Sequence, residues 1–188
     1  MYLEISARQT GKTTRLIKQA ISDAINGHEV IIVTNNVSNK KILYNKIIEE
    51  INQKPDIEDF QKSALLTHIR LLGVYEVKNF LESECEFAEY DYLWFYDEFD
   101  LIREDYQIIF SEDGYYTTTP KRNRTVEDII SHKIGKKPDP LLKLIEMNNG
   151  KYVQHSSLLT MECNNLFNLS SMSSQDFNLE YGVQLFKW

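Results

Sequence analysis

The sequence predicts a single α/β domain, with helices packed against a mainly parallel central sheet. Apolar segments of strand length alternate with helices that carry one apolar face. Residues 29–34, Glu-Val-Ile-Ile-Val-Thr, form a β-branched run typical of strands buried on both faces of a parallel sheet. A chain of 188 residues with 42% hydrophobic content suffices for one core, whereas two domains would each be marginal. One domain is therefore expected over residues 1–188.

The first elements are a strand, a helix and a second strand. A short apolar strand at residues 2–5 precedes a helix that ends at Asn26 and Gly27, and the strand at residues 29–34 follows. The helix has a stripe at i, i+4 spacing, which predicts that it packs on the sheet. The stripe consists of Leu16, Ile17, Ala20, Ile21, Ala24 and Ile25.

The later elements are placed by apolar patterns and by turn residues. A second helix is expected from a Ser38 cap to Ile51, closed by Pro55, with an apolar side of Ile42, Leu43, Ile47 and Ile48. A short helix is expected at residues 60–66. Strands are expected at residues 69–75, 92–96 and 115–119, with at least one more within 151–160. The strand at 92–96 is expected beside the first strand.

Composition excludes several classes of protein. The net charge of -7 and the pI of about 5.2 argue against a wholly basic, DNA-coating protein, although a local basic patch is allowed. No segment approaches the ~20 apolar residues that cross a bilayer, and no signal-like stretch follows Met1. A soluble, cytoplasmic protein without membrane contact is therefore expected. Cys85 and Cys163 are far apart in sequence, so neither a zinc site nor a disulfide is expected and both should be free thiols.

Residues 6–13, Ser-Ala-Arg-Gln-Thr-Gly-Lys-Thr, lie between the first strand and the first helix, where a phosphate-binding loop belongs. Gly11 allows the loop amides to turn inward, Lys12 supplies charge for the outer phosphates, and the Thr13 hydroxyl is placed to hold Mg²⁺. Ser6 replaces the first glycine of the usual pattern. The residues expected to bind the nucleotide are Ser6, Ala7, Arg8, Gln9, Thr10, Gly11, Lys12, Thr13 and Thr14. The alternative is an ordinary turn before a helix.

Two acids follow the apolar strand at residues 92–96. Acids at the carboxyl end of a central parallel strand face the crevice where such sheets bind ligands. Asp97 is therefore predicted to reach Mg²⁺, usually through its waters, and Glu98 to orient and deprotonate an attacking water. The alternative is a strand that ends in solvated acids.

A third segment delivers hydroxyl groups at a strand end. Thr117, Thr118 and Thr119 are followed by Pro120, so this strand is predicted to sense the γ-phosphate or the attacking water and to relay that state. The alternative is an ordinary edge strand, since threonine favours strands and proline stops them.

Arginines near these motifs are candidates for contact with the transferring phosphoryl group. Arg8 lies inside the loop, and Arg122 and Arg124 follow the threonines. The latter two belong to an irregular stretch at residues 120–140, interpreted as a mobile basic loop around a short helix or as a merely solvated charge run. Its basic residues are Lys121, Arg122, Arg124, Lys133, Lys136 and Lys137.

These motifs resemble those of the large terminase subunit of tailed bacteriophages. Residues 6–14 resemble its variant Walker A loop, which often reads Ser-Arg-Gln-x-Gly-Lys-Thr/Ser and lacks the first glycine. The strand ending in Asp97 and Glu98 resembles its Walker B motif, and residues 117–120 resemble its coupling motif. Residues 173–188 are similar to the segment with which the family leaves its ATPase domain. The likeness spans nearly the whole chain.

The resemblance implies a P-loop NTPase of the ASCE/RecA-like class, a three-layer sandwich that hydrolyses ATP with Mg²⁺. It further implies a homo-oligomeric ring that packages double-stranded DNA through the portal, with the small terminase subunit, in the cytoplasm of an infected bacterium. Lys12 and Thr13 would carry phosphate and Mg²⁺, Glu98 would be the base and Arg8 an arginine acting in cis. In a ring, Arg122 or Arg124 would reach the neighbouring subunit.

Two departures from the family accompany the resemblance. No nuclease domain follows Trp188, so a separate ATPase or an excised domain is expected. Only residues 1–5 precede the loop, so adenine recognition has no assigned residue. Two other functions stay open: one lobe of a helicase-like DNA-remodelling ATPase, and a nucleotide-gated binding module without useful turnover.

Overall fold

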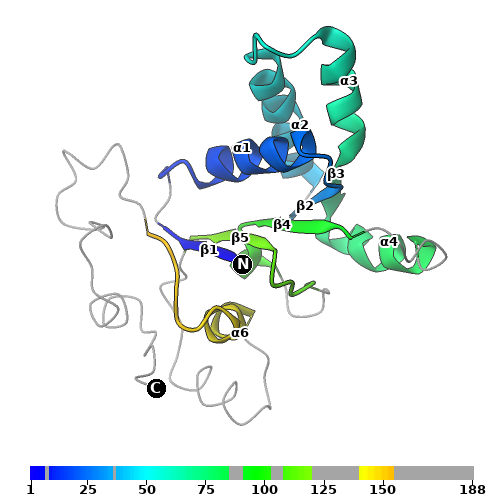
Figure 1. Ribbon diagram of the computed structural model, residues 1–188. Helices are drawn as coiled ribbons and strands as arrows, with labels where there is room; N and C mark the ends of the chain where they lie inside the picture. Colours follow the sequence, from blue (N-terminus) through cyan, green and yellow to red (C-terminus); the bar gives the residue numbers. More distant parts are fainter. Residues whose placement is uncertain (7–8, 36, 85–90, 103–107, 120–139, 155–188) are drawn as a thin grey trace.

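The computed structural model describes residues 1–6, 9–35, 37–84, 91–102, 108–119 and 140–154. At its centre lies a five-stranded sheet in which every strand pairs in parallel with its neighbours (Figure 1). The strand order is β1-β5-β4-β2-β3. The strands are β1 (Tyr2–Ile5), β2 (Val30–Thr34), β3 (Ile69–Gly73), β4 (Leu93–Asp97) and β5 (Tyr115–Thr118). The predicted α/β class and parallel sheet are therefore confirmed.

Helices cover both faces of the sheet. On one face, α1 (Lys12–Ile25), α2 (Val37–Asn52) and α3 (Asp59–His68) pack against alternate strand residues such as Val30 and Ile32. On the other face, α4 (Val77–Glu84) and α6 (Pro140–Met147) pack against the residues in between, such as Ile31 and Val33. Figure 1 shows the resulting three layers, with the first three helices on one side and α6 on the other. The β2 strand is buried along its whole length, as its β-branched run predicts.

Most predicted elements are present, and the differences lie at their ends and faces. The second helix begins at Val37, so Ser38 lies in its first turn and is not its cap. Ile42 is 53% exposed and Ile25 is 47% exposed, so each lies off its predicted apolar stripe. Ile51 is instead buried beside Leu43 and Ile47.

The strand expected at residues 69–75 is shorter than predicted. It ends at Gly73, and a 3₁₀ turn, η1 (Val74–Glu76), follows. The Glu76 carboxylate accepts a 2.6 Å hydrogen bond from the Gly73 N–H and closes this turn. That bond and the neighbouring ammonium of Lys40 lower the pKa of Glu76 against the opposing effect of its burial.

The helices on the second face were not predicted. Both α4 and α6 are eight residues long, and an apolar run this short does not distinguish a helix from a strand. The strand expected within residues 151–160 is present in the described part only as an isolated parallel bridge between Val153 and Glu4. Residues 155–160 lie outside the described residues.

The expected neighbour of the first strand is also wrong. β5 lies between β1 and β4, with Thr117 in register with both Glu4 and Asp97. The expectation failed because strand order depends on pairing between distant segments, which local patterns do not encode. Its consequence is that the threonine strand lies between the strand that precedes the loop and the strand that precedes the two acids.

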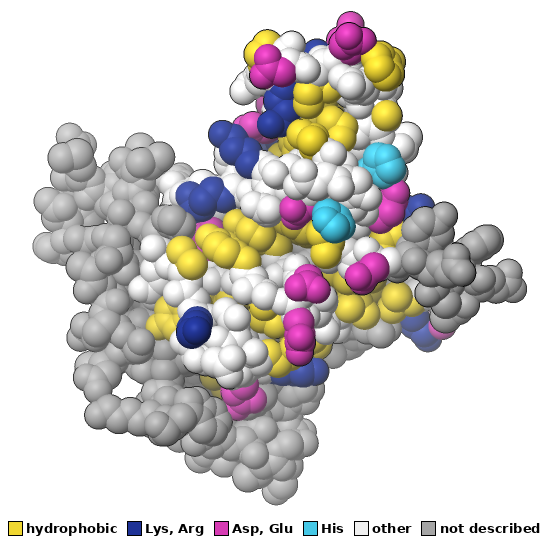
Figure 2. All heavy atoms as spheres, in the orientation of Figure 1, with side chains coloured by type: hydrophobic (Ala, Val, Ile, Leu, Met, Phe, Trp, Pro, Cys, Tyr) yellow, Lys and Arg dark blue, Asp and Glu magenta, His cyan; other side chains and the backbone are white. Residues whose placement is uncertain are grey.

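Several predictions concern residues outside the described ranges. These are Ala7, Arg8, Arg122 and Arg124, both thiols, the basic stretch up to residue 139, and the terminal segment at 173–188. Within the described part, no helix combines the length and the apolar character needed to cross a membrane. Figure 2 shows acidic and basic side chains interspersed on one face, with apolar side chains reaching the surface around α2 and α3. Exposed residues there include Tyr44 and Phe60.

Candidate functional site

The predicted phosphate loop connects β1 to α1, as its sequence context requires. Gly11 has φ 81° and is the residue before the first turn of α1, so it adopts the left-handed conformation that glycine tolerates best. A Cβ atom at Gly11 would lie 3.2 Å from Nη1 of Arg15, which makes the position tight as well as strained for other residues. The loop therefore leads into the amino end of α1, where free amide groups favour an anion.

Lys12 is held inside the site instead of extending into solvent. Its side chain is 4% exposed, and its Nζ donates a 3.0 Å hydrogen bond to Oγ1 of Thr119. The same Nζ lies 3.3 Å from Oε1 of Glu98. The lysine of the loop, an acid that follows β4 and a threonine that follows β5 thus meet at the carboxyl edge of the sheet.

Thr13 and Asp97 form a second contact at this edge. The Thr13 hydroxyl donates a 2.9 Å hydrogen bond to Oδ1 of Asp97, which Oγ1 of Thr117 also approaches at 3.4 Å. Asp97 is 7% exposed, and its burial raises its pKa, with the Thr13 hydrogen bond opposing that shift. Thr13 and Asp97 therefore place a hydroxyl and a buried carboxylate next to each other on the α1 side of the sheet.

The donors at this edge fit Mg²⁺. One lysine faces the two carboxylates of Asp97 and Glu98, so the group has an excess of negative charge that a cation would offset. Among the described residues, no three His, Cys, Asp or Glu side chains form a group that could hold a metal. A Mg²⁺ ion at Thr13 and Asp97 would then take most of its ligands from water and phosphate oxygens, as this ion commonly does.

Glu98 has an unusual backbone conformation. Its φ of 55° and ψ of 48° place it in the left-handed region, which costs a non-glycine residue roughly 1 kcal/mol. The turn directs its carboxylate toward Thr119, whose N–H and hydroxyl donate hydrogen bonds of 2.6 and 2.8 Å. Neither Asp97 nor Glu98 is thus a solvated strand end, and β5 is no edge strand.

Two residues that support the loop were not predicted from the sequence. Glu4 is fully buried in β1, and Arg15 on α1 donates to both of its carboxylate oxygens. Arg15 also donates a 2.7 Å hydrogen bond to the carbonyl of Thr10 in the loop. The bond to Glu4 raises the pKa of Arg15, so the guanidinium stays charged. The sequence does contain a signal for this pair, since Glu4 is an acid inside an apolar strand. A buried charge needs a partner, so a nearby basic residue could have been expected.

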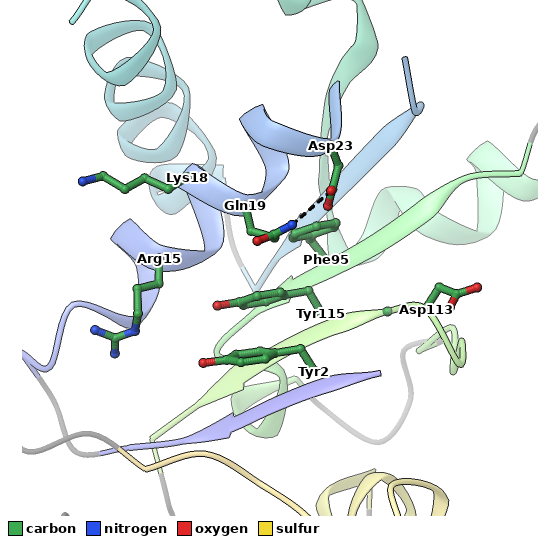
Figure 3. A pocket seen from close by; sticks show the side chains of 9 residues that line it. Tyr2, Arg15, Lys18, Gln19, Asp23, Phe95, Asp113 and Tyr115 are labelled. Atoms are coloured by element: carbon green, nitrogen blue, oxygen red, sulfur yellow. Dashed lines mark hydrogen bonds between the residues drawn. The ribbon is translucent and has the colours of Figure 1, made fainter. Parts of the chain in front are cut away.

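Arg15 is also one wall of a groove of about 580 Å³ on the α1 side of the sheet (Figure 3). The floor of the groove is a row of stacked rings, with centroids 4.2 Å apart for Tyr2 and Tyr115 and 5.2 Å apart for Tyr115 and Phe95. Figure 3 shows Lys18 and Gln19 on α1 above this row, and both tyrosine hydroxyls on the same side as Arg15. The groove therefore ends at the side chain that supports the loop.

Removing the Arg15 guanidinium is expected to destabilise the fold through Glu4. In Arg15→Met the buried Glu4 carboxylate loses its charged partner and retains the 3.5 Å hydrogen bond from the Tyr2 hydroxyl, which should lower the free energy of unfolding by about 2 kcal/mol. Urea unfolding measures this change, and Lys18→Met, an exposed cation on the same helix, is the control with an unchanged midpoint. A Glu4→Gln, Arg15→Met double variant should recover part of the loss. Equal losses in the single and double variants would contradict the pairing.

The other predicted loop residues differ in their surroundings. Ser6 is buried, and its N–H donates a 3.1 Å hydrogen bond to the Thr118 carbonyl, which extends the pairing of β1 with β5. Gln9 and Thr14 are exposed. The structure thus brings together Lys12 and Thr13 with Asp97, Glu98, Thr117 and Thr119.

Known proteins add no assignment to this geometry. No protein-family model matches the chain, and neither the curated proteins nor the solved structures give a significant match.

Proposed function

We propose that this protein is a Mg²⁺-dependent ATPase of the P-loop NTPase class, ASCE/RecA-like in its fold. The observation that carries the proposal is the meeting of Lys12 and Thr13 with Asp97 and Glu98 at one edge of a parallel sheet. Asp97 and Glu98 follow Lys12 and Thr13 by 84 or more positions in the sequence. The Thr13 hydroxyl nevertheless lies 2.9 Å from the Asp97 carboxylate, and Lys12 Nζ lies 3.3 Å from the Glu98 carboxylate. Such edges are where open parallel sheets bind ligands.

Each residue has a role in the proposed reaction. The loop amides and Lys12 would hold the β- and γ-phosphates, while Thr13 and Asp97 would hold Mg²⁺. The bound ion would neutralise phosphate charge and orient the transferring group. Glu98 would accept a proton from the attacking water, and Thr119, which donates a hydrogen bond to Glu98, would detect the γ-phosphate.

The ion pair between Lys12 and Glu98 bears on how the site would bind nucleotide. Lys12 has to leave Glu98 before its ammonium can contact phosphate, because both groups compete for the same charge. Its departure would release the Glu98 carboxylate for water. Nucleotide binding would thus free the Glu98 carboxylate to act as the base.

The motor function is proposed from the order of the motifs. The Walker A-like loop, the Asp97–Glu98 pair and the Thr117–Thr119 segment follow the order seen in large terminase subunits, which supports packaging of double-stranded DNA by a ring on a portal. β5 lies between β1 and β4. Thr117 in β5 contacts Asp97 and Thr119, directly after β5, contacts Glu98, so this segment would relay the state of the nucleotide. Arg8, Arg122 and Arg124 remain the candidates for the arginine that contacts the γ-phosphate.

Phosphate release by the full chain, with and without double-stranded DNA, tests the proposal. Mg²⁺-dependent hydrolysis that rises with double-stranded DNA is the expected result. Stimulation by single-stranded DNA alone would indicate a helicase-like lobe, and ATP binding without phosphate release would indicate a nucleotide-gated module. No ATP binding in Mg²⁺ would overturn the proposed enzyme altogether.

A further inference from the structure

A buried hydroxyl group near the site has no hydrogen-bond partner among the residues that the structure describes. Thr34 is the last residue of β2 and is fully buried, and its Oγ1 has no hydrogen-bond partner within the described residues. The four residues before it in the strand are valine or isoleucine. Valine would have the same shape without a polar atom to bury, so the hydroxyl costs stability unless something binds it.

Thr34 is the strand neighbour of Asp97. The two residues are partners in the parallel pairing of β2 with β4. Val30 and Ile32, which share the face of Thr34, pack in the same core as Phe95, which shares the face of Asp97. Both side chains therefore lie on the α1 side, where Thr13 contacts the carboxylate.

Within the described residues, no hydrogen bond joins Thr34 Oγ1 to the Asp97 carboxylate. Residues paired on adjacent strands lie about 4.8 Å apart. Thr117, the partner of Asp97 on the other neighbouring strand, approaches the carboxylate directly at 3.4 Å. A Thr34 hydroxyl that makes no such direct bond is therefore within reach of one water that also binds Asp97. A polar contact beyond about 3.5 Å is commonly bridged by water, and a buried water needs two or more polar partners. The Thr34 hydroxyl and the Asp97 carboxylate are two such partners.

We propose that the Thr34 hydroxyl binds a water of the Mg²⁺ hydration shell and so positions the ion against Asp97. The inference rests on the proposed ATPase function and adds a positioning residue to it. Mg²⁺ gives up its waters reluctantly and is held in part through them. A metal-bound water would give the buried hydroxyl the hydrogen bond that the described residues do not supply.

Thr34→Val in the full chain separates this role from a structural one. Binding of a non-hydrolysable ATP analogue, measured by calorimetry, should weaken about tenfold in Mg²⁺ and stay unchanged in EDTA. The melting temperature without ligand should stay the same or rise by roughly 2–4 °C, because the variant no longer buries an unsatisfied hydroxyl. A merely structural hydroxyl would instead lower the melting temperature.

Thr34→Ser is the matched control, since it keeps the hydroxyl and should retain most of the Mg²⁺-dependent affinity. Equal affinity of the parent and Thr34→Val in Mg²⁺, or an equal loss in EDTA, would overturn the role of Thr34 while leaving the ATPase standing. Failure of Thr34→Val to fold would also overturn it, because the hydroxyl would then be structural. A parent chain that binds no analogue in Mg²⁺ would overturn both proposals.

Discussion

Lys12→Ala is expected to lower kcat/KM for ATP by about 10³-fold or more. The ammonium would contact phosphate in the bound state, and this interaction would become stronger as charge develops in the transition state. Both binding and turnover would therefore depend on it. Loss of a hydrogen bond to a charged group accounts for about tenfold in affinity, and loss of transition-state stabilisation for about 10²- to 10³-fold in kcat.

Steady-state phosphate release and analogue binding together measure the two losses. Lys46→Ala is the matched control, because it removes an exposed lysine on α2 and should leave both constants unchanged. Near-parent hydrolysis by Lys12→Ala would show that the loop does not bind phosphate. Circular dichroism should accompany the measurement, because Lys12 is buried and pairs with Glu98.

Glu98→Gln is expected to keep nucleotide binding and to lose about 10²- to 10⁴-fold in kcat. The amide has the shape of the carboxylate. Its oxygen can accept the hydrogen bond from the Thr119 N–H, and its NH2 group can donate to the Thr119 hydroxyl oxygen, so the left-handed turn should persist. It cannot accept a proton from water. Affinity for Mg²⁺-ATP should be equal or tighter, since Lys12 no longer has to leave a carboxylate.

Binding and single-turnover hydrolysis separate these two effects. Glu82→Gln removes an exposed acid on α4 and is the control with unchanged turnover. Retained turnover in Glu98→Gln would exclude Glu98 as the base. Equal loss of binding and turnover would indicate instead that Glu98 shapes the site.

Local patterns in the sequence determined the class of the fold and the core of the candidate site. The β-branched run of β2 predicts burial on both faces, and the stripe of α1 predicts its packing. Gly11 and Lys12 predict a loop between strand and helix, because a left-handed turn and a helix start are set by a few adjacent residues. Apolar runs as short as α4 and α6 carry too little periodicity for the same inference.

Only the tertiary structure decided how the loop, the two acids and the threonine segment come into contact. Lys12 contacts a threonine 107 positions away, and this contact exists because β5 lies between β1 and β4. The pairing of Glu4 with Arg15 likewise follows from packing, as does the burial of the Thr34 hydroxyl without a partner among the described residues. The physical reason is the distance along the chain over which each effect acts. Periodicity and turn chemistry involve a few adjacent residues, whereas strand order and buried polar contacts depend on the free energy of the whole packed sheet.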